Sequence, residues 1–152
     1  MALQLKQSPR FVLVGIYGLY NYGCEAIVRG TIQILRREWP NCRIVLATRS
    51  VERDRKVLND IEKVQIVQSH KRWTWKRLIF GVMRRLGHGV GSPQVLSRSL
   101  HRYGDVVLSV GGDNYAMVGD QPGPLLDGLR QLGDETIRQR KTFVIWGASV
   151  GP

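Results

Sequence analysis

The chain of 152 residues is long enough for one domain with a buried core, and its 43% content of hydrophobic residues excludes a disordered protein. Two cysteines are too few for a disulfide framework or a metal site, so we expect no bound metal. The amino-terminal residues do not resemble a signal peptide, and no run approaches the roughly 18 apolar residues of a membrane span. We therefore expect a cytoplasmic protein. The net charge of +11 indicates an anionic partner.

Apolar runs and helix-period segments alternate along the chain. Strands are predicted at 11–16, 43–48, 64–68, 106–110 and 142–146, and helices at 24–39, 51–60, 73–86, 93–103 and 125–140. The first helix is expected to bury a stripe formed by Ile27, Val28, Thr31, Ile34 and Leu35. The strands are uninterrupted apolar runs, which is typical of strands buried on both faces. The sequence therefore predicts an α/β fold, a Rossmann-like parallel sheet with helices on both faces.

The first strand leads into a glycine-rich turn, residues 15–26, that opens the first helix. Free backbone N–H groups and the helix dipole at such a place favour an anion. The substrate-binding candidates in this turn are Tyr17, Gly18, Asn21, Gly23 and Glu25. Two of them have simpler roles open to them, since Asn21 would serve as a helix cap and Glu25 would favour the helix dipole without touching a ligand.

A dinucleotide site is weakly supported, because the turn matches neither G-x-G-x-x-G nor a P-loop. The second strand is followed by Arg49 where a ribose-binding acid would be expected, so only an NADP-like site, with Arg49 at the 2′-phosphate, stays open. Cys24 lies near the helix start, but a small half-buried cysteine is favoured over a nucleophile, since no histidine is close in sequence.

One segment makes the protein basic: residues 63–102 hold nine Lys or Arg and no Asp or Glu. Within it, residues 70–89 mix basic, tryptophan and aliphatic side chains. That composition suits a helix lying on an anionic membrane surface, at the inner face of the membrane, or an ordinary helix packed on the sheet. The histidines of this segment, His70, His88 and His101, are expected to be solvated or to contact phosphate. Nucleic acid is not expected, because no reading motif is present.

Residues 105–120 join the most strand-like run of the sequence to its most loop-like run. We expect a central, parallel strand whose carboxyl end delivers the candidates Gly111, Gly112, Asp113 and Asn114, followed by a loop with two prolines. In open α/β sheets ligands bind at that edge, although such a turn also serves as a tight strand exit. The last strand ends likewise in a polar loop with the candidate Ser149. The exits after Ile16, Val110 and Trp146 should meet at one rim.

Three segments, GIYGLYNYGCEAIVRG, DVVLSVGGDNY and KTFVIWGASVGP, together resemble the amino-terminal half of the polysaccharide pyruvyl transferase family. The family pattern Asn-x-Gly-x-Glu-Ala corresponds to Asn21, Gly23, Glu25 and Ala26, its Gly-Gly to Gly111 and Gly112, and its Gly-x-Ser-x-Gly-Pro to Gly147, Ser149, Gly151 and Pro152. Position 24 is Cys where some members carry an acid, so acid chemistry is not expected there.

The resemblance implies a GT-B-like enzyme with two Rossmann-like domains. It implies transfer of a pyruvyl group from phosphoenolpyruvate, with no other cofactor, to a sugar of a surface polysaccharide or its lipid-linked precursor, as in exopolysaccharide biosynthesis of the cell envelope. Residues 1–152 would be the amino-terminal domain, with the second domain truncated or supplied by another chain, and the chain alone is expected to be inactive. No catalytic residue is assigned. Two alternatives stay open: a non-catalytic module that binds a phospho-ligand or a membrane surface, and a fragment of an NADP- or nucleotide-sugar-dependent enzyme.

Overall fold

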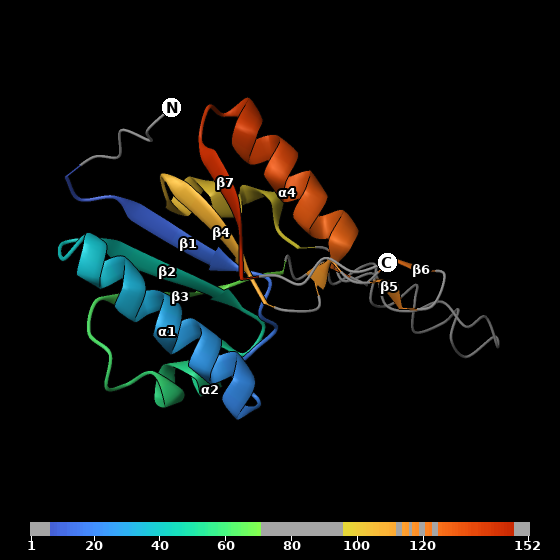
Figure 1. The fold of residues 1–152 in the computed structure, drawn as a ribbon. Helices are drawn as coiled ribbons and strands as arrows, with labels where there is room; N and C mark the ends of the chain where they lie inside the picture. The colour runs from blue at the N-terminus through green and yellow to red at the C-terminus, as the bar shows by residue number, and fades with distance from the viewer. Residues whose placement is uncertain are drawn as a thin grey trace.

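One parallel sheet carries the fold (Figure 1). The computed structural model describes residues 7–70, 96–111, 114–115, 117–118, 121–122 and 125–147, and the sheet order is β3-β2-β1-β4-β7. The strands are β1 (Arg10–Val14), β2 (Arg43–Thr48), β3 (Val64–Gln68), β4 (Val106–Val110) and β7 (Thr142–Trp146). All four pairings in this sheet are parallel, which confirms the predicted α/β Rossmann-like class. β4 is parallel as predicted, but the prediction that it is the central strand is wrong, because β1 holds that place and β4 lies between β1 and the edge strand β7.

Helices cover both faces of the sheet, as the apolar strands required. On one face α1 (Tyr22–Glu38) and α2 (Val51–Val57) pack against alternate residues of β1, β2 and β4, such as Leu13 and Leu46. On the other face the 3-10 helix η1 (Arg98–Tyr103) and α4 (Leu126–Arg138) pack against the intervening residues, such as Val12 and Val107. Strands with apolar side chains on both faces would expose those side chains to water unless a helix layer covered each face. Burial of both faces therefore favours this three-layer arrangement.

The buried stripe of α1 differs from the predicted one. Val28, Thr31 and Leu35 are buried as expected, whereas Ile27 and Ile34 are exposed by 37% and 43%. Ile32, which was not predicted, is buried. The buried residues Val28, Ile32 and Leu35 follow the i, i+4, i+7 spacing of one helix face. The helix is therefore rotated slightly about its axis from the orientation that the predicted stripe would give.

The segment before β4 was predicted as a helix at 93–103, and this is wrong for part of the range. Leu96 forms an antiparallel bridge with His70, and the Ser97 N–H donates to the Ser69 carbonyl, so residues 96 and 97 are extended and a helix begins only at Arg98. His101 was expected to be solvated or to contact phosphate. It is instead 7% exposed, and its Nδ1 lies 2.7 Å from the Arg98 carbonyl oxygen, to which it donates.

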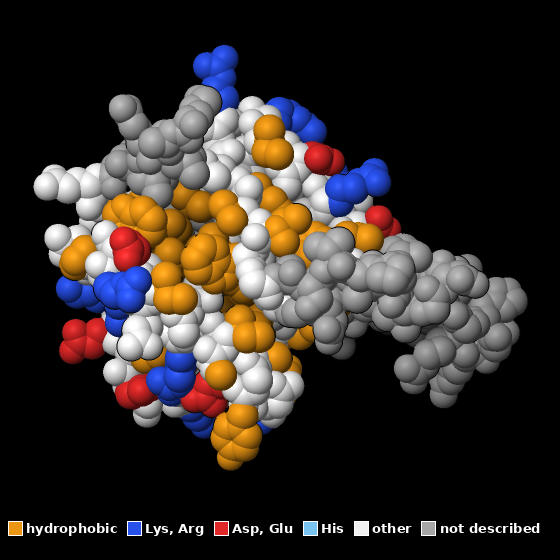
Figure 2. Space-filling view, in the orientation of Figure 1, with side chains coloured by type: hydrophobic (Ala, Val, Ile, Leu, Met, Phe, Trp, Pro, Cys, Tyr) orange, Lys and Arg blue, Asp and Glu red, His pale blue; other side chains and the backbone are white. Residues whose placement is uncertain are grey.

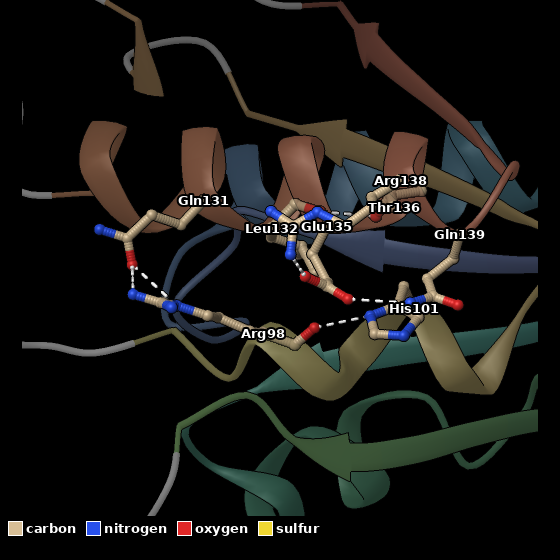
Figure 3. Close-up of polar contacts among 8 residues, drawn as sticks. All are labelled: Arg98, His101, Gln131, Leu132, Glu135, Thr136, Arg138 and Gln139. Carbon is tan, nitrogen blue, oxygen red and sulfur yellow. Dashed lines mark hydrogen bonds and ion pairs between the residues drawn. The ribbon is translucent and has the colours of Figure 1, made fainter.

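A polar contact at the start of η1 joins this helix to α4, as Figure 3 shows. The Arg98 Nε and Nη2 atoms both donate to Gln131 Oε1 of α4, at 3.0 and 2.7 Å. Within α4 the Thr136 hydroxyl donates back to the Leu132 carbonyl at 2.6 Å, which satisfies a fully buried hydroxyl without a partner from another element. The contacts between Arg98 and Gln131 hold η1 against α4 on the sheet face that both cover.

Two short strands follow β4 where a proline-containing loop was predicted. β5 (Met117–Val118) pairs antiparallel with β6 (Gln121–Pro122) in a separate two-stranded sheet. The sequence signal for this hairpin was the Gly-Asp pair at 119 and 120, which is favoured in two-residue hairpin connections. The predicted helix at 73–86 lies outside the described residues.

β7 is an edge strand with incomplete cover. Val144 and Trp146 only partly pack against the α1 side of the core, and Ile145 is 52% exposed. Figure 2 shows apolar side chains gathered at the surface between α1 and β7, while charged side chains lie mainly on the outer helix surfaces. In the described part of the chain no helix lies over β7 on this face, which leaves these side chains half-buried.

Candidate functional site

The polar loops leave the sheet at a single edge, because all its strands are parallel. The exits of β1 and β4 touch: the Asn114 side-chain amide donates to the Val110 carbonyl at 2.9 Å and lies directly over Gly15 and Gly111. Both glycines have positive φ, +98° and +124°, which only glycine adopts without strain. Trp146 is in register with Val110, so the exit of β7 lies next to that of β4. The three strands therefore end at one edge, as predicted, and of the residues after Trp146 the structure describes only Gly147.

Three side chains from three different exits form a cluster at this edge, which we call the 17/49/70 cluster. The Arg49 guanidinium carbon lies 3.7 Å from the centre of the Tyr17 ring. The His70 ring stacks on the same tyrosine, with ring centroids 6.5 Å apart and planes 18° from parallel. The backbone fixes the first pair, since the Arg49 N–H donates to the Tyr17 carbonyl at 3.1 Å. Sheet order β3-β2-β1 therefore brings residues 17, 49 and 70 together.

Arg49 is half-buried, and the shielded side of its guanidinium lacks a polar partner among the described residues. Its Nε and Nη2 atoms are shielded from solvent and have no hydrogen-bond partner among the described residues, and no carboxylate forms an ion pair with it there. Burial lowers the pKa of Arg49, while Tyr17 and Tyr20 oppose that shift. A guanidinium keeps its charge in proteins, and an unpaired buried charge is costly. Stacking on the Tyr17 ring recovers part of this cost through cation–π attraction.

The other two members of the 17/49/70 cluster also have unpartnered polar atoms. The Tyr17 hydroxyl and His70 Nε2 are buried atoms with no hydrogen-bond partner in the part of the chain that the structure describes, and burial raises the pKa of Tyr17. His70 Nδ1 lies 2.6 Å from the Ser69 hydroxyl. Burial, and then the charge of Arg49, lower the pKa of His70 to about 4, so the imidazole is neutral at pH 7. If Ser69 donates to Nδ1, then Nε2 carries the proton and is a hydrogen-bond donor.

The low pKa of His70 predicts a loss of stability in mild acid. Between pH 6.5 and about 4 the unfolded chain binds a proton at His70 that the folded protein does not, so the free energy of unfolding falls as the pH is lowered through this window. We expect a loss on the order of 2 kcal/mol, which discounts the full shift because the ring is only partly buried. Urea unfolding at pH 6.5 and 4.2 should show a smaller loss for His70→Gln than for the wild type. Equal losses in both proteins would contradict the prediction.

The structure also describes the other four candidates of the first turn. Asn21 is the N-cap of α1, and its side-chain oxygen accepts from the Cys24 N–H at 2.8 Å. Gly23 lies exposed in the first turn of α1, and Gly18 faces the Tyr20 ring. Glu25 accepts from Arg29 Nε at 2.7 Å, and Arg29 continues to Asp60 after α2. A ligand role for these four residues stays a prediction, and of the first-turn candidates only Tyr17 belongs to the 17/49/70 cluster.

The candidates after β4 are only partly described. Gly111 and Asn114 lie at the rim as predicted, whereas Gly112, Asp113 and Ser149 lie outside the described residues, as do residues 71–89 of the basic segment. Tyr115 adds a buried hydroxyl beside Ser109, and burial raises its pKa while Ser109 lowers it. Neither hydroxyl makes a hydrogen bond of normal geometry, although Ser109 is near enough to affect the titration of Tyr115.

The sequence did not predict the contact of Arg49 with Tyr17, or the presence of His70 and Tyr115 at this edge of the sheet. The sequence offers Arg49 only as a 2′-phosphate ligand, and His70 only as a solvated or phosphate-contacting residue of the basic segment. The signal available was positional: Arg49 follows the second strand directly, and His70 comes two residues after the third. The carboxyl ends of consecutive parallel strands meet at one edge, so residues at those positions are candidates for one site.

A broad depression lies at the opposite, amino edge of the sheet. Its volume is about 720 Å³, and its lining includes Arg10, Arg43, Lys63 and Arg102. It is open, and three of its basic side chains come from the starts of strands or the turn before one. Because the strand exits are at the other edge, this depression is separate from the 17/49/70 cluster.

Comparison with known proteins supports the resemblance seen in the sequence. The sequence model described as polysaccharide pyruvyl transferase matches residues 21–152, which is most of the chain. Searches of curated proteins and of solved structures found no match. None of the helices in the described residues has the length and hydropathy of a membrane-crossing segment. The family match, together with a parallel sheet whose strand exits meet at one edge, shows that the chain belongs to the polysaccharide pyruvyl transferase family.

Proposed function

We propose that the protein takes part in the transfer of a pyruvyl group from phosphoenolpyruvate to a sugar of a surface polysaccharide or its lipid-linked precursor. The observation that carries this proposal is the family match over residues 21–152. The carboxyl edge of the sheet supports it, since that edge gathers polar groups from several strand exits, where α/β proteins bind their ligands.

The reaction makes clear what such an edge must bind. Two sugar hydroxyl oxygens form bonds to C2 of phosphoenolpyruvate, the bond from C2 to the phosphate oxygen breaks, and the methylene carbon gains a proton and becomes a methyl group. The hydroxyls supply two protons, one for this methyl group and one for the released phosphate. The product is a pyruvate ketal, and its carboxylate is unchanged. The donor therefore presents a phosphate and a carboxylate, and N–H donors and a cation are suited to hold either group.

We also propose that residues 1–152 are the amino-terminal domain of a GT-B-like enzyme, and that the second domain is supplied by further sequence or by another chain. This rests on the family resemblance alone. In two-domain enzymes of this build the reacting groups meet between the domains, so one domain holds ligands without completing the reaction. The chain alone is expected to show no release of phosphate from phosphoenolpyruvate in the presence of glycan. Measurable turnover by the purified 152-residue chain would contradict this assignment.

Membrane association through residues 70–89 stays a proposal based on composition. A lipid-linked acceptor would place the enzyme at an anionic surface, where a basic segment with tryptophans binds favourably. Co-sedimentation with liposomes that contain or lack anionic lipid tests it, and equal binding to both would remove it.

The donor assignment is tested by nuclear magnetic resonance on the isotope-labelled chain. Phosphoenolpyruvate should shift backbone amide signals at the carboxyl edge, including those of Gly18 and Asn114, and leave those of the amino-edge residues Arg10 and Lys63 unchanged. NADPH and a nucleotide sugar serve as comparison ligands, since an NADP- or nucleotide-sugar-dependent enzyme is the alternative that the sequence left open. If NADPH shifts the carboxyl-edge signals and phosphoenolpyruvate does not, the pyruvyl transfer proposal is wrong.

A further inference from the structure

Arg49 has the geometry of an anion ligand whose partner is not part of the described chain. The two unpartnered atoms, Nε and Nη2, lie on the same side of the guanidinium and form the edge that binds two oxygens of one carboxylate or phosphate. An arginine that served only to stack on Tyr17 would be expected to direct these donors toward water or backbone carbonyls, because buried donors without partners destabilise a fold.

The surroundings of Arg49 favour an anion over an internal carboxylate. Of the two acids of the neighbouring helix α2, Glu52 is exposed, and Asp54 is fully buried and already accepts from the Leu19 N–H and the Thr48 hydroxyl. The groups that influence the pKa of Arg49 electrostatically are two tyrosines. Among the described residues, the cluster thus has one positive charge and no carboxylate in an ion pair with it, at the edge where the strand exits gather.

Two further polar groups belong to the same cluster. The Tyr17 ring holds the guanidinium on its face, and its hydroxyl is buried without a partner. His70 stacks on the same ring and has an unpartnered Nε2. A phosphate has enough acceptor oxygens to satisfy the fork of Arg49 and accept further hydrogen bonds, whereas one water molecule makes only about three.

We propose that Arg49, supported by Tyr17 and His70, binds one phosphate group of a substrate at the carboxyl edge of the sheet. This inference rests on the proposed function for the source of the phosphate, which is either phosphoenolpyruvate or the phosphate that links an acceptor sugar to its lipid carrier. Tyr17 positions the guanidinium by stacking, and His70 contributes a neutral N–H. None of the three is assigned to the transfer step itself.

The test compares Arg49→Met with Arg53→Met. Arg53 is a matched control, because it is an arginine of the adjacent helix α2 whose guanidinium also lies over a tyrosine ring, 4.9 Å from the centre of Tyr20, but which is exposed. Calorimetric binding is measured for phosphoenolpyruvate, N-acetylglucosamine 1-phosphate and inorganic phosphate. We expect Arg49→Met to weaken binding of the preferred probe by at least tenfold, since a charge-assisted pair of hydrogen bonds is lost, and Arg53→Met to change it less than twofold.

Arg49→Lys is a second variant that can be measured if Arg49→Met does not fold. Lysine keeps the charge but cannot present two parallel donors, so binding should be weaker than in the wild type and stronger than in Arg49→Met. The side-chain Nε–H signal of Arg49, identified by its absence in Arg49→Lys, should shift when the bound probe is added to the wild type. No shift of this signal, or equal affinities for the two methionine variants, would overturn the inference.

The probes separate this inference from the proposed function. Arg49-dependent binding of N-acetylglucosamine 1-phosphate without binding of phosphoenolpyruvate supports the phosphate site and assigns it to the acceptor, so the donor must bind elsewhere. Binding of phosphoenolpyruvate that does not depend on Arg49 supports the proposed function and overturns the site. Failure of every phosphate probe to bind the folded wild-type chain overturns the site as well.

Discussion

Gly15→Ala is expected to lower the free energy of unfolding by about 4 kcal/mol. Gly15 has φ of +98°, which strains any residue with a side chain, and an added Cβ would lie 2.5 Å from Asn114 Nδ2 and 2.6 Å from the Val110 carbonyl oxygen. The Asn114 side chain could move, but the carbonyl belongs to the end of a fully buried strand and has little freedom. Urea unfolding followed by circular dichroism measures the change.

Gly30→Ala is the matched control for this prediction. Gly30 lies inside α1, and nothing is within 4 Å of an added Cβ, so the same substitution should stabilise the protein by roughly 0.5–1 kcal/mol through helix propensity. Opposite signs for the two variants would show that conformation and close contact at the β1 exit, and not glycine content, determine the effect. A Gly15→Ala protein as stable as the wild type would mean that the β1 and β4 exits do not touch as described.

Asp54→Ala is expected to cost about 3 kcal/mol and to lower the melting temperature by roughly 10 °C. Asp54 is 0% exposed, and its carboxylate accepts from the Leu19 N–H at 3.0 Å and from the Thr48 hydroxyl at 2.5 Å. After truncation the Thr48 hydroxyl keeps a second acceptor, the Tyr17 carbonyl at 3.2 Å. The Leu19 N–H keeps none, so most of the cost comes from this one buried donor.

Asp54→Asn distinguishes the lost acceptor from the lost charge. The amide oxygen can still accept from the Leu19 N–H, and the Thr48 hydroxyl can accept from the amide nitrogen while donating to the Tyr17 carbonyl. We therefore expect a loss of only about 1 kcal/mol for asparagine. Equal losses for Ala and Asn would indicate that the negative charge itself, not the hydrogen bond to Leu19, stabilises this position. Differential scanning calorimetry of the three proteins gives the comparison.

Both predictions concern the loop that carries Tyr17. Gly15 lets the chain turn beneath Asn114, and Asp54 ties Leu19 to the start of α2. Because the Tyr17 carbonyl also accepts from the Arg49 N–H, the loop, β2 and the 17/49/70 cluster form one hydrogen-bonded unit. Loosening either anchor should therefore weaken phosphate binding as well as stability.

Much of the fold was predictable, because the pattern of apolar residues along the sequence indicates which residues are buried. The strands at 43–48, 64–68 and 142–146 have the predicted bounds, since each is an apolar or alternating run bounded by turn residues. The first strand ends at Val14, two residues earlier than predicted, because Gly15 takes a positive φ. The failures were also physical: pairing of Leu96 with His70 prevented a helix from starting before Arg98, and η1 buried His101 in a segment whose charge indicated exposure.

By itself the sequence determined the α/β class, the alternation of elements and the family, because apolar periodicity and glycine-rich strand exits are local properties of the chain. Only the tertiary structure decided that Tyr17, Arg49 and His70 meet. They are more than 20 residues apart in sequence, and they come together because β3, β2 and β1 are consecutive neighbours in a parallel sheet. Long-range packing, which no local pattern encodes, also shielded Nε and Nη2 of Arg49 from solvent with no hydrogen-bond partner among the described residues.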